Sequence, residues 1–282
     1  MRSKPPRKSG KDRRPFSPTP AFSSKPKPPP RGERPAAPPR LVKPGRSENL
    51  IYGLHAVQAA LANPRRKVGR ALLTPRATET IGEKLLARVQ VETMDPESIG
   101  KLLPPGAVHQ GAALEAAPLP PLDLGEVVDK AQGGRRKIVL VLDQISDPHN
   151  VGAILRTGAA FGVAAVVVQD RNAPPQSGAL AKAASGALDI IPYVEVVNIA
   201  RALDMLAERG FWRIALAGDG EQSIAEAVPP GDVALVLGSE GSGIRRLVRE
   251  HCEAAAFIPI GREMESLNVS NAAAIALYEL RR

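Results

Sequence analysis

The sequence lacks the residues that crosslink small domains or hold metal ions. It contains a single cysteine, Cys252, so no disulfide can form within the chain. The four histidines do not combine with this cysteine in any spacing typical of zinc sites, and we expect no metal centre. We therefore expect Cys252 to be a packed and chemically inert thiol.

Long apolar segments are also absent. No apolar run approaches the roughly 18 residues that cross a bilayer. The N-terminus carries charged residues and prolines where a secretory signal would have its hydrophobic segment. These absences predict a cytoplasmic protein with no membrane partner. With 282 residues and 43% hydrophobic content, the chain can bury a sizeable core in about two domains.

Acidic residues are scarce at the beginning of the chain. Residues 1–46 hold 14 Lys and Arg against two acids, a net charge of +12, whereas residues 47–282 hold 24 against 27, a net charge of −3. The same 46 residues contain 13 of the 28 prolines and few large apolar side chains. Such a segment buries too little surface to offset its chain entropy, so we expect a disordered tail.

A flexible cationic arm suits a polyanion such as RNA, because neutralising phosphates releases condensed counterions whatever the base sequence. Two other interpretations of the tail stay open. It can be a solubilising segment without a dedicated target, or a mitochondrial presequence. The second is disfavoured because the prolines prevent the amphipathic helix that import requires.

The composition becomes that of a folded domain near residue 47. A strand at Leu50–Tyr52 and a helix ending near Asn63 are followed by a strand at Gly69–Thr74 and a helix around Thr78–Gln90. We interpret residues 47–117 as a small α/β domain. The prolines after Ala117 and the glycines before Arg135 predict a linker over residues 118–136.

Residues 137–282 alternate apolar runs of strand length with helical patterns. The runs are Ile138–Leu142, Ala164–Val168, Ile190–Val196, Arg213–Ala217, Val233–Leu237 and Ala255–Ile260. Continuous Val, Ile and Leu without polar alternation is typical of strands that helices cover on both faces. The pattern predicts an α/β fold with a parallel sheet, whose ligands bind beyond the carboxyl ends of the strands.

The first polar segment at such a position begins with Asp147 and Pro148, which we expect to form a turn. Asn150 is well placed to cap a helix over Val151–Phe161, with Arg156 on its flank. Asn150 can be a plain cap and Arg156 a solvated side chain. Alternatively, the planar guanidinium can clamp an RNA phosphate or a developing oxyanion.

The second segment is the glycine-rich loop 238–243, between a buried strand and a helix expected near Ile244. It lacks the Gly-Lys-Ser/Thr of a Walker loop, and Glu240 would repel a phosphate. A dinucleotide-binding loop is disfavoured as well, because it would open the first βα unit of the domain. A tight turn and a cofactor or substrate loop that uses Glu240 both remain open.

The third segment lies between Ile258, at a strand end, and a final helix rich in alanine. Ser266, Leu267 and Asn268 precede this helix. Either Ser266 or Asn268 can be its N-cap. The alanines permit close packing of the helix against the sheet or against a partner subunit.

In this order and spacing, the three segments of residues 137–282 resemble the catalytic domain of the SpoU/TrmH family of RNA ribose 2′-O-methyltransferases. In addition, Ile51-Tyr52-Gly53, His55-Ala56-Val57 and His109-Gln110-Gly111 resemble the RNA-binding domain of members that methylate a guanosine in large-subunit ribosomal RNA. The resemblance implies a SPOUT-type α/β fold with a trefoil knot, S-adenosylmethionine as cofactor, RNA as partner and a homodimer.

The resemblance also assigns residues. By motif, the catalytic and substrate-positioning residues are Asn150, Arg156, Glu240, Ser266 and Asn268. The residues whose backbone would hold the cofactor are Gly238, Ile258 and Leu267. The family assigns the arginine as a base, but a guanidinium stays protonated, so we favour phosphate binding and stabilisation of alkoxide charge.

Two positions depart from the family pattern. Arg262 stands where many relatives have glycine, and Asn271 replaces a usually apolar residue. Two rival functions are a transfer-RNA 2′-O-methyltransferase and a non-catalytic RNA-binding protein of ribosome assembly on the same fold. The first is disfavoured by the additional N-terminal domain, and the second by the polar residues retained at every motif position.

Overall fold

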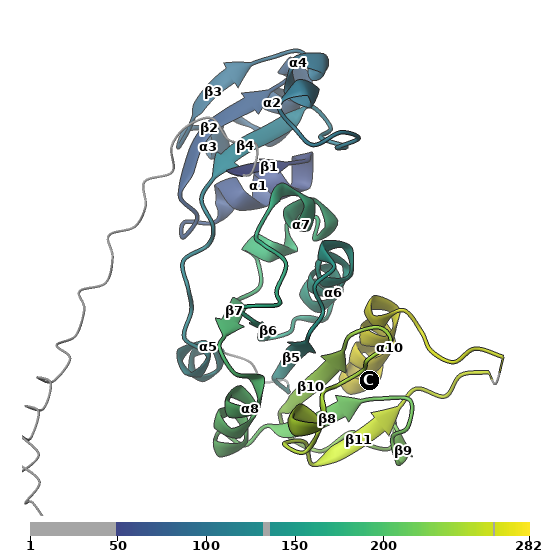
Figure 1. Cartoon of the computed structure of the whole chain (residues 1–282). Helices are drawn as coiled ribbons and strands as arrows, with labels where there is room; N and C mark the ends of the chain where they lie inside the picture. The colour runs from purple at the N-terminus through teal and green to yellow at the C-terminus, as the bar shows by residue number, and fades with distance from the viewer. Residues whose placement is uncertain (1–48, 132–135, 262) are drawn as a thin grey trace, which may run out of the picture. The chain divides into compact units, whose positions relative to one another are not determined.

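The computed structural model describes residues 49–131, 136–261 and 263–282, and Figure 1 shows their arrangement. The predicted tail and Arg262 lie outside these residues. The described residues all belong to one compact unit. Within the described residues, no helix has the length and apolar character needed to cross a membrane.

The first sheet is mixed and has the strand order β1-β4-β2-β3. Its strands are β1 (Leu50–Tyr52), β2 (Val68–Leu73), β3 (Gln90–Thr93) and β4 (Ala112–Ala116). The β2–β3 pair is parallel, and β4 is antiparallel to both β1 and β2. Its helices are α1 (Leu54–Ala62), α2 (Pro75–Ile81), α3 (Glu83–Leu86) and α4 (Pro96–Lys101).

The prediction of a single helix around Thr78–Gln90 is wrong. Two short helices, α2 and α3, replace it, and they are separated by Gly82 with φ +82°. Glycine adopts this left-handed conformation without steric cost, so the chain turns there. The expected strand and helix at residues 50–63 are confirmed as β1 and α1, with Asn63 at the C-cap.

The stretch that the sequence indicates as a linker contains a helix, α5 (Leu124–Lys130). Asp123 caps it by accepting a hydrogen bond from the backbone N–H of Glu126 at 2.9 Å. Leu124 and Val128 are buried in the core that lies under the second sheet. The prediction of a linker over residues 118–136 is therefore corrected for residues 124–130, which belong to the folded core.

The second sheet is parallel throughout and has the order β7-β6-β5-β10-β8-β11-β9. Its strands are β5 (Ile138–Asp143), β6 (Ala165–Gln169), β7 (Tyr193–Val196), β8 (Trp212–Leu216), β9 (Gln222–Ser223), β10 (Val233–Gly238) and β11 (Ala254–Phe257). The predicted parallel sheet is confirmed. Two expected strands are shorter, because β7 begins at Tyr193 and β11 ends at Phe257.

Helices cover both faces of this sheet (Figure 1). They are α6 (Pro148–Phe161), α7 (Gly178–Ala183), α8 (Ile199–Glu208), α9 (Arg246–Arg249) and α10 (Val269–Arg281), with a 3₁₀ turn, η2 (Ala187–Asp189). Leu140 and Leu142 pack with α6, α7 and α10, whereas Val139 and Val141 pack with α5, α8 and α9. This double cover explains why the strands show no polar alternation.

A buried ion pair joins the two sheets. Arg66 follows α1 and is 1% exposed, and its Nε lies 2.8 Å from Oδ1 of Asp189 in η2. The Arg66 guanidinium also donates to the carbonyl of Ala117 at 2.8 Å. Because a buried charge is tolerated only when it is paired and hydrogen-bonded, this contact fixes α1 against η2.

Candidate active site

The three polar segments meet through a cluster of three side chains, Asn150, Glu240 and Asn268. Asn268 Nδ2 donates to Glu240 Oε1 at 2.8 Å and to Asn150 Oδ1 at 2.9 Å. Asn150 Nδ2 donates to the same Glu240 oxygen at 3.2 Å. Glu240 Oε2 accepts no hydrogen bond from the described residues. The cluster therefore ties together three segments that span 118 residues of the chain and leaves one carboxylate oxygen available.

Asn150 reaches this cluster because it does not cap its helix. Asp147 is the N-cap of α6, and its Oδ1 accepts from the backbone N–H of His149 at 3.0 Å. The expectation that Asn150 caps the helix is therefore wrong. Pro148 occupies the first helical turn, where its missing N–H costs nothing, and it indicates the cap one residue before it. Asn150 lies in the first turn with its amide free to contact Glu240.

The loop that carries Glu240 requires glycine at its base. Gly238 ends β10, and a Cβ atom there would lie 2.2 Å from the carbonyl carbon of Gly243. Ser239 and Gly243 exchange backbone hydrogen bonds of 2.9 and 3.2 Å, which fold the loop back onto the strand. Gly241 and Gly243 both have positive φ, at +87° and +66°. This tight turn places Glu240 at the carboxyl end of β10, where the sequence predicts a cofactor or substrate loop.

Two further residues hold this loop, Asp143 and Arg245, and neither was predicted from the sequence. Asp143 is the last residue of β5, is fully buried and is the register partner of Gly238. Its carboxylate accepts from the Arg245 backbone N–H and from Arg245 Nε, both at 2.8 Å. A carboxylate directly after a buried strand was the available signal, but its partner lies 102 residues away.

The N-cap of α10 is Asn268, one of the two candidates. Its Oδ1 accepts from the backbone N–H groups of Ser270 at 3.0 Å and Asn271 at 3.3 Å, and from the Ser270 hydroxyl. The single Asn268 side chain thus starts α10 with its oxygen and binds Glu240 with its nitrogen. Asn271, which departs from the family pattern, is exposed in the first turn of α10.

Arg156 and Ser266 do not join the cluster. Arg156 lies on α6 and Ser266 in the loop before α10; both side chains are exposed. Neither forms a hydrogen bond or an ion pair with the described residues. An exposed guanidinium without a partner is available to an anionic ligand.

Two of the three residues predicted to hold the cofactor lie at strand ends, and the third lies in the loop before α10. Gly238 ends β10, Ile258 directly follows β11, and Leu267 directly precedes Asn268. Between these strands lies β8, followed by a loop in which a Cβ at Gly218 would meet nothing within 4 Å. The same is true of Gly261 in the loop after β11. The space beside the backbone is open at both positions, so this rim has room for a ligand beyond the strand ends.

The chain matches two families over most of its length. Residues 137–278 match the SpoU rRNA Methylase family. Residues 50–122 match the family described as RNA 2′-O ribose methyltransferase substrate binding.

Curated relatives resemble the chain over nearly their whole length. The 23S rRNA (guanosine-2′-O-)-methyltransferase RlmB of Vibrio cholerae is 36% identical over 238 residues, which cover 83% of this chain and 96% of the relative. The protein of the same description from Pseudomonas putida is 37% identical over 237 residues, covering 81% and 94%.

Solved structures share the fold. A putative RNA methyltransferase of the TrmH family from Porphyromonas gingivalis superposes with a TM-score of 0.64 at 28% identity, covering 83% of this chain and 89% of that one. The SpoU methyltransferase AviRb from Streptomyces viridochromogenes, in complex with the cofactor AdoMet, has a TM-score of 0.69 at 21% identity, with the same coverage.

Proposed function

Because the chain belongs to the SpoU rRNA methylase family, we propose that it transfers a methyl group from S-adenosylmethionine to the ribose 2′-hydroxyl of a guanosine in large-subunit ribosomal RNA. It is an RNA 2′-O-methyltransferase with the SPOUT-type α/β fold. The named relatives carry the same two segments and act on 23S rRNA by description, which supports ribosomal over transfer RNA.

One observation supports the chemistry most directly. Asn150, Glu240 and Asn268, from three separate segments, form one hydrogen-bonded cluster at the strand ends. Methyl transfer requires the hydroxyl oxygen in line with the methyl carbon, and a rigid polar cluster provides such alignment. We assign to Glu240 Oε2 the hydrogen bond from the ribose hydroxyl, since this atom has no partner among the described residues.

The cofactor would be held by backbone groups of Gly238, Ile258 and Leu267. When bound, S-adenosylmethionine supplies an electrophilic methyl group on its sulfonium, which leaves S-adenosylhomocysteine after transfer. The chain needs to bind both partners, orient the hydroxyl and accept its proton as the new O–C bond forms. We assign that last role to Glu240 Oε2, which already accepts the hydroxyl's hydrogen bond.

Arg156 is assigned to the RNA. Its guanidinium cannot serve as a base at neutral pH, because it stays protonated. We assign to it a contact with a substrate phosphate and stabilisation of the negative charge that develops on the ribose oxygen. Arg156→Lys at saturating cofactor tests this, with an expected loss of about 100-fold in kcat. A kcat close to that of the wild type would rule out a special role for the planar guanidinium group of Arg156.

Ser266 is assigned to the substrate side of the same site. Ser266 is exposed and lies two residues before Asn268 in the sequence, so its hydroxyl is available as a donor to RNA. We assign RNA binding to residues 47–117 and catalysis to residues 137–282, and the matches at residues 50–122 and 137–278 support this division.

We also propose a cytoplasmic homodimer. The relatives, which are described as 23S rRNA methyltransferases of bacteria, support the compartment, because bacterial ribosomal RNA lies in the cytoplasm. Ile275 and Tyr278 support the dimer, because they are 39% and 57% exposed and lie three residues apart on one face of α10. Sedimentation of the full chain tests this assembly, and a monomer at micromolar concentration would contradict it.

The activity is tested with the purified full chain, tritiated S-adenosylmethionine and unmodified 23S rRNA. The expected product is a single 2′-O-methylguanosine, located by primer extension at low nucleotide concentration. The same assay with unmodified transfer RNA tests the rival substrate. If calorimetry shows no binding of S-adenosylmethionine, with or without RNA, the proposed function is wrong.

A further inference from the structure

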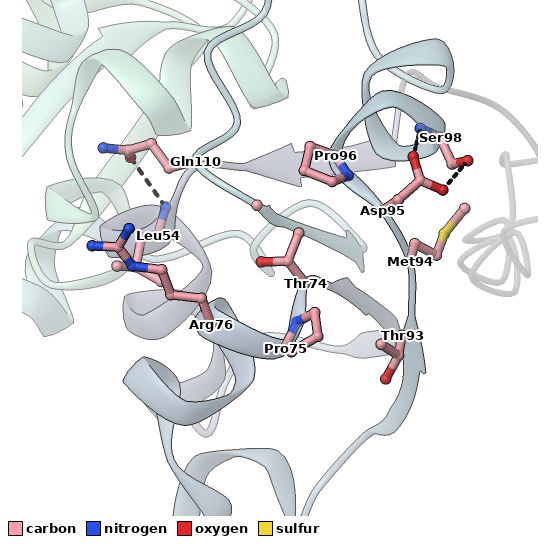
Figure 2. A pocket seen from close by; sticks show the side chains of 11 residues that line it. Leu54, Thr74, Pro75, Arg76, Thr93, Met94, Asp95, Pro96, Ser98 and Gln110 are labelled. Atoms are coloured by element: carbon pink, nitrogen blue, oxygen red, sulfur yellow. Dashed lines mark hydrogen bonds between the residues drawn. The ribbon is translucent and has the colours of Figure 1, made fainter.

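A hollow of about 1080 Å³ opens at one rim of the four-stranded sheet (Figure 2). No strand of the seven-stranded sheet contributes to its lining. The parallel strands β2 and β3 both end there, at the register partners Leu73 and Thr93. Ligands of parallel strands usually bind beyond such carboxyl ends, so the hollow occupies a position suited to binding.

Local hydrogen bonds orient the polar groups at the rim of the hollow. Thr74 Oγ1 accepts a hydrogen bond from the backbone N–H of Ala77 at 3.3 Å. Asp95 accepts from the Ser98 backbone N–H at 2.9 Å and from the Ser98 hydroxyl at 2.7 Å. The side-chain and backbone hydrogen bonds from Ser98 lower the pKa of Asp95, so it stays ionised. The polar groups of the rim are therefore held in place before any ligand binds.

Gln110 has an unusual backbone on the other side of the hollow. Its φ is +54°, which is uncommon for a residue other than glycine and marks a local constraint. The next residue, Gly111, has φ +77°, and a Cβ there would lie 2.4 Å from Thr74 Oγ1. Gln110 Oε1 accepts from Lys182 Nζ at 2.7 Å and from the Leu54 backbone N–H at 3.3 Å. The loop is thus fixed with a lysine of α7 at its edge.

Charge is divided across the hollow. Figure 2 shows Arg76 and Gln110 on one side, and Met94, Asp95 and Pro96 on the other. Arg76 is exposed, and its guanidinium forms no hydrogen bond or ion pair with the described residues. An unpaired guanidinium can bind a phosphate or stack on a base, and Lys182 adds a second cation nearby.

The walls fit a nucleotide chain rather than a free phosphate. The volume of about 1080 Å³ leaves far more room than a single phosphate fills. Pro75, Met94 and Pro96 offer apolar surface to base faces. Asp95 would repel phosphate but accept a hydrogen bond from a base amino group. A duplex cannot present its bases in this way, whereas unstacked bases of loops and bulges can.

We propose that this hollow binds an unpaired segment of the substrate RNA, with bases between Pro75 and Pro96 and a phosphate or base face on Arg76. This proposal rests on the proposed function and adds to it. The hollow selects single-stranded RNA near the target nucleotide, whereas the target ribose itself binds at a different site, the Asn150–Glu240–Asn268 cluster.

The test compares Arg76→Ala with Lys84→Ala in the full chain. Lys84, on α3, is also exposed and forms no ion pair within the described part of the chain, but it does not line the hollow. Binding is measured by filter retention with a 23S rRNA stem-loop that the wild-type protein methylates, and with a duplex of matched length. For the stem-loop, Arg76→Ala should weaken binding about tenfold, and Lys84→Ala less than twofold. For the duplex, both variants should bind alike.

Cross-linking gives a second measurement that does not depend on a substitution. With 4-thiouridine in the loop of the RNA, cross-links should map to the two protein segments around Met94 and around Gln110. No such cross-links should form with the duplex. Equal stem-loop binding by both variants, or cross-links only outside the hollow, overturns the proposal. In either case the wild-type protein would still methylate ribosomal RNA and bind S-adenosylmethionine, whereas failure of the proposed function abolishes both.

Discussion

Asp143, at the end of β5, is bound by Arg245, at the far end of the Glu240 loop. Arg245 Nη2 lies 2.6 Å from Asp143 Oδ1, and the carboxylate is fully buried while the guanidinium side chain is 38% exposed. Arg245 Nη2 also donates to Gln169 at the end of β6, at 3.1 Å. Gly238 anchors the other end of the loop. The position of Glu240 is therefore set by two neighbouring strands.

Asp143→Asn should destabilise the protein and disturb the loop. Asp143 accepts from Arg245 with both of its oxygens, whereas an asparagine amide has only one acceptor oxygen, so one hydrogen bond in a buried position is lost. Because the Arg245 side chain is partly exposed and its charge stays solvated, we expect the free energy of unfolding to fall by about 2 kcal/mol. Urea denaturation measures this. Glu126→Gln in the exposed Glu126–Lys130 pair is the control, with an expected change below about 1 kcal/mol. Equal effects of the two substitutions would show that Asp143 does not hold the loop.

Local sequence was enough to predict the parallel sheet but not this pair. Leu140 and Val141 are both 0% exposed, so burial on both faces produces the continuous apolar run that identifies β5. Asp143 directly follows that apolar run in the sequence. Its pairing with Arg245 depends on β5 and β10 being neighbours, which is a property of strand order and not of local pattern.

Cys252 should be nearly unreactive in the folded protein. Burial raises the pKa of its thiol to about 12, so almost no thiolate is present at neutral pH. We expect alkylation by iodoacetamide at pH 8 to be at least about 100-fold slower than in the same protein unfolded in guanidinium chloride. Mass spectrometry follows the reaction. Comparable rates in both states would show that Cys252 is accessible as a thiolate.

Glu115 should make stability depend on acid pH. The side-chain hydrogen bond from Arg70, at 2.7 Å, holds the pKa of the Glu115 carboxyl below its ordinary 4.5. A depressed pKa contributes stability above the ordinary value, and that contribution is lost as pH falls through the folded pKa. Glu115→Gln should therefore be less stable than wild type at pH 7, and the difference should shrink on acidification below pH 4.5.

Urea midpoints at a series of pH values measure this difference. Glu97→Gln, in the exposed Glu97–Lys101 pair, controls for the loss of one surface carboxylate. If the difference in urea midpoint between wild type and Glu115→Gln stays constant from pH 7 to pH 3, the Glu115 carboxylate does not stabilise the folded protein through a lowered pKa.

The site residues show a similar division between local and non-local information. Local sequence narrowed the N-cap of α10 to Ser266 or Asn268, because both are capping types just before the helix, and the structure shows that it is Asn268. The convergence of Asn150 and Asn268 on one oxygen of Glu240 was not, since it depends on how the strand ends meet. The resemblance to a family assigned these residues, and the structure brings three of the five into contact.

Asn268→Asp separates the two roles of that side chain. Aspartate caps α10 as well as asparagine does, because its oxygen still accepts from the Ser270 and Asn271 N–H groups. At the other atom, however, a carboxylate oxygen replaces the N–H donor 2.8 Å from Glu240, and two like charges face each other. We expect helix content and thermal unfolding to change little, while kcat falls by about 100-fold at saturating cofactor. Adding Glu240→Gln removes the repulsion and restores a donor, so the double variant should exceed Asn268→Asp alone in activity. Additive losses would show that the two residues do not act through their contact.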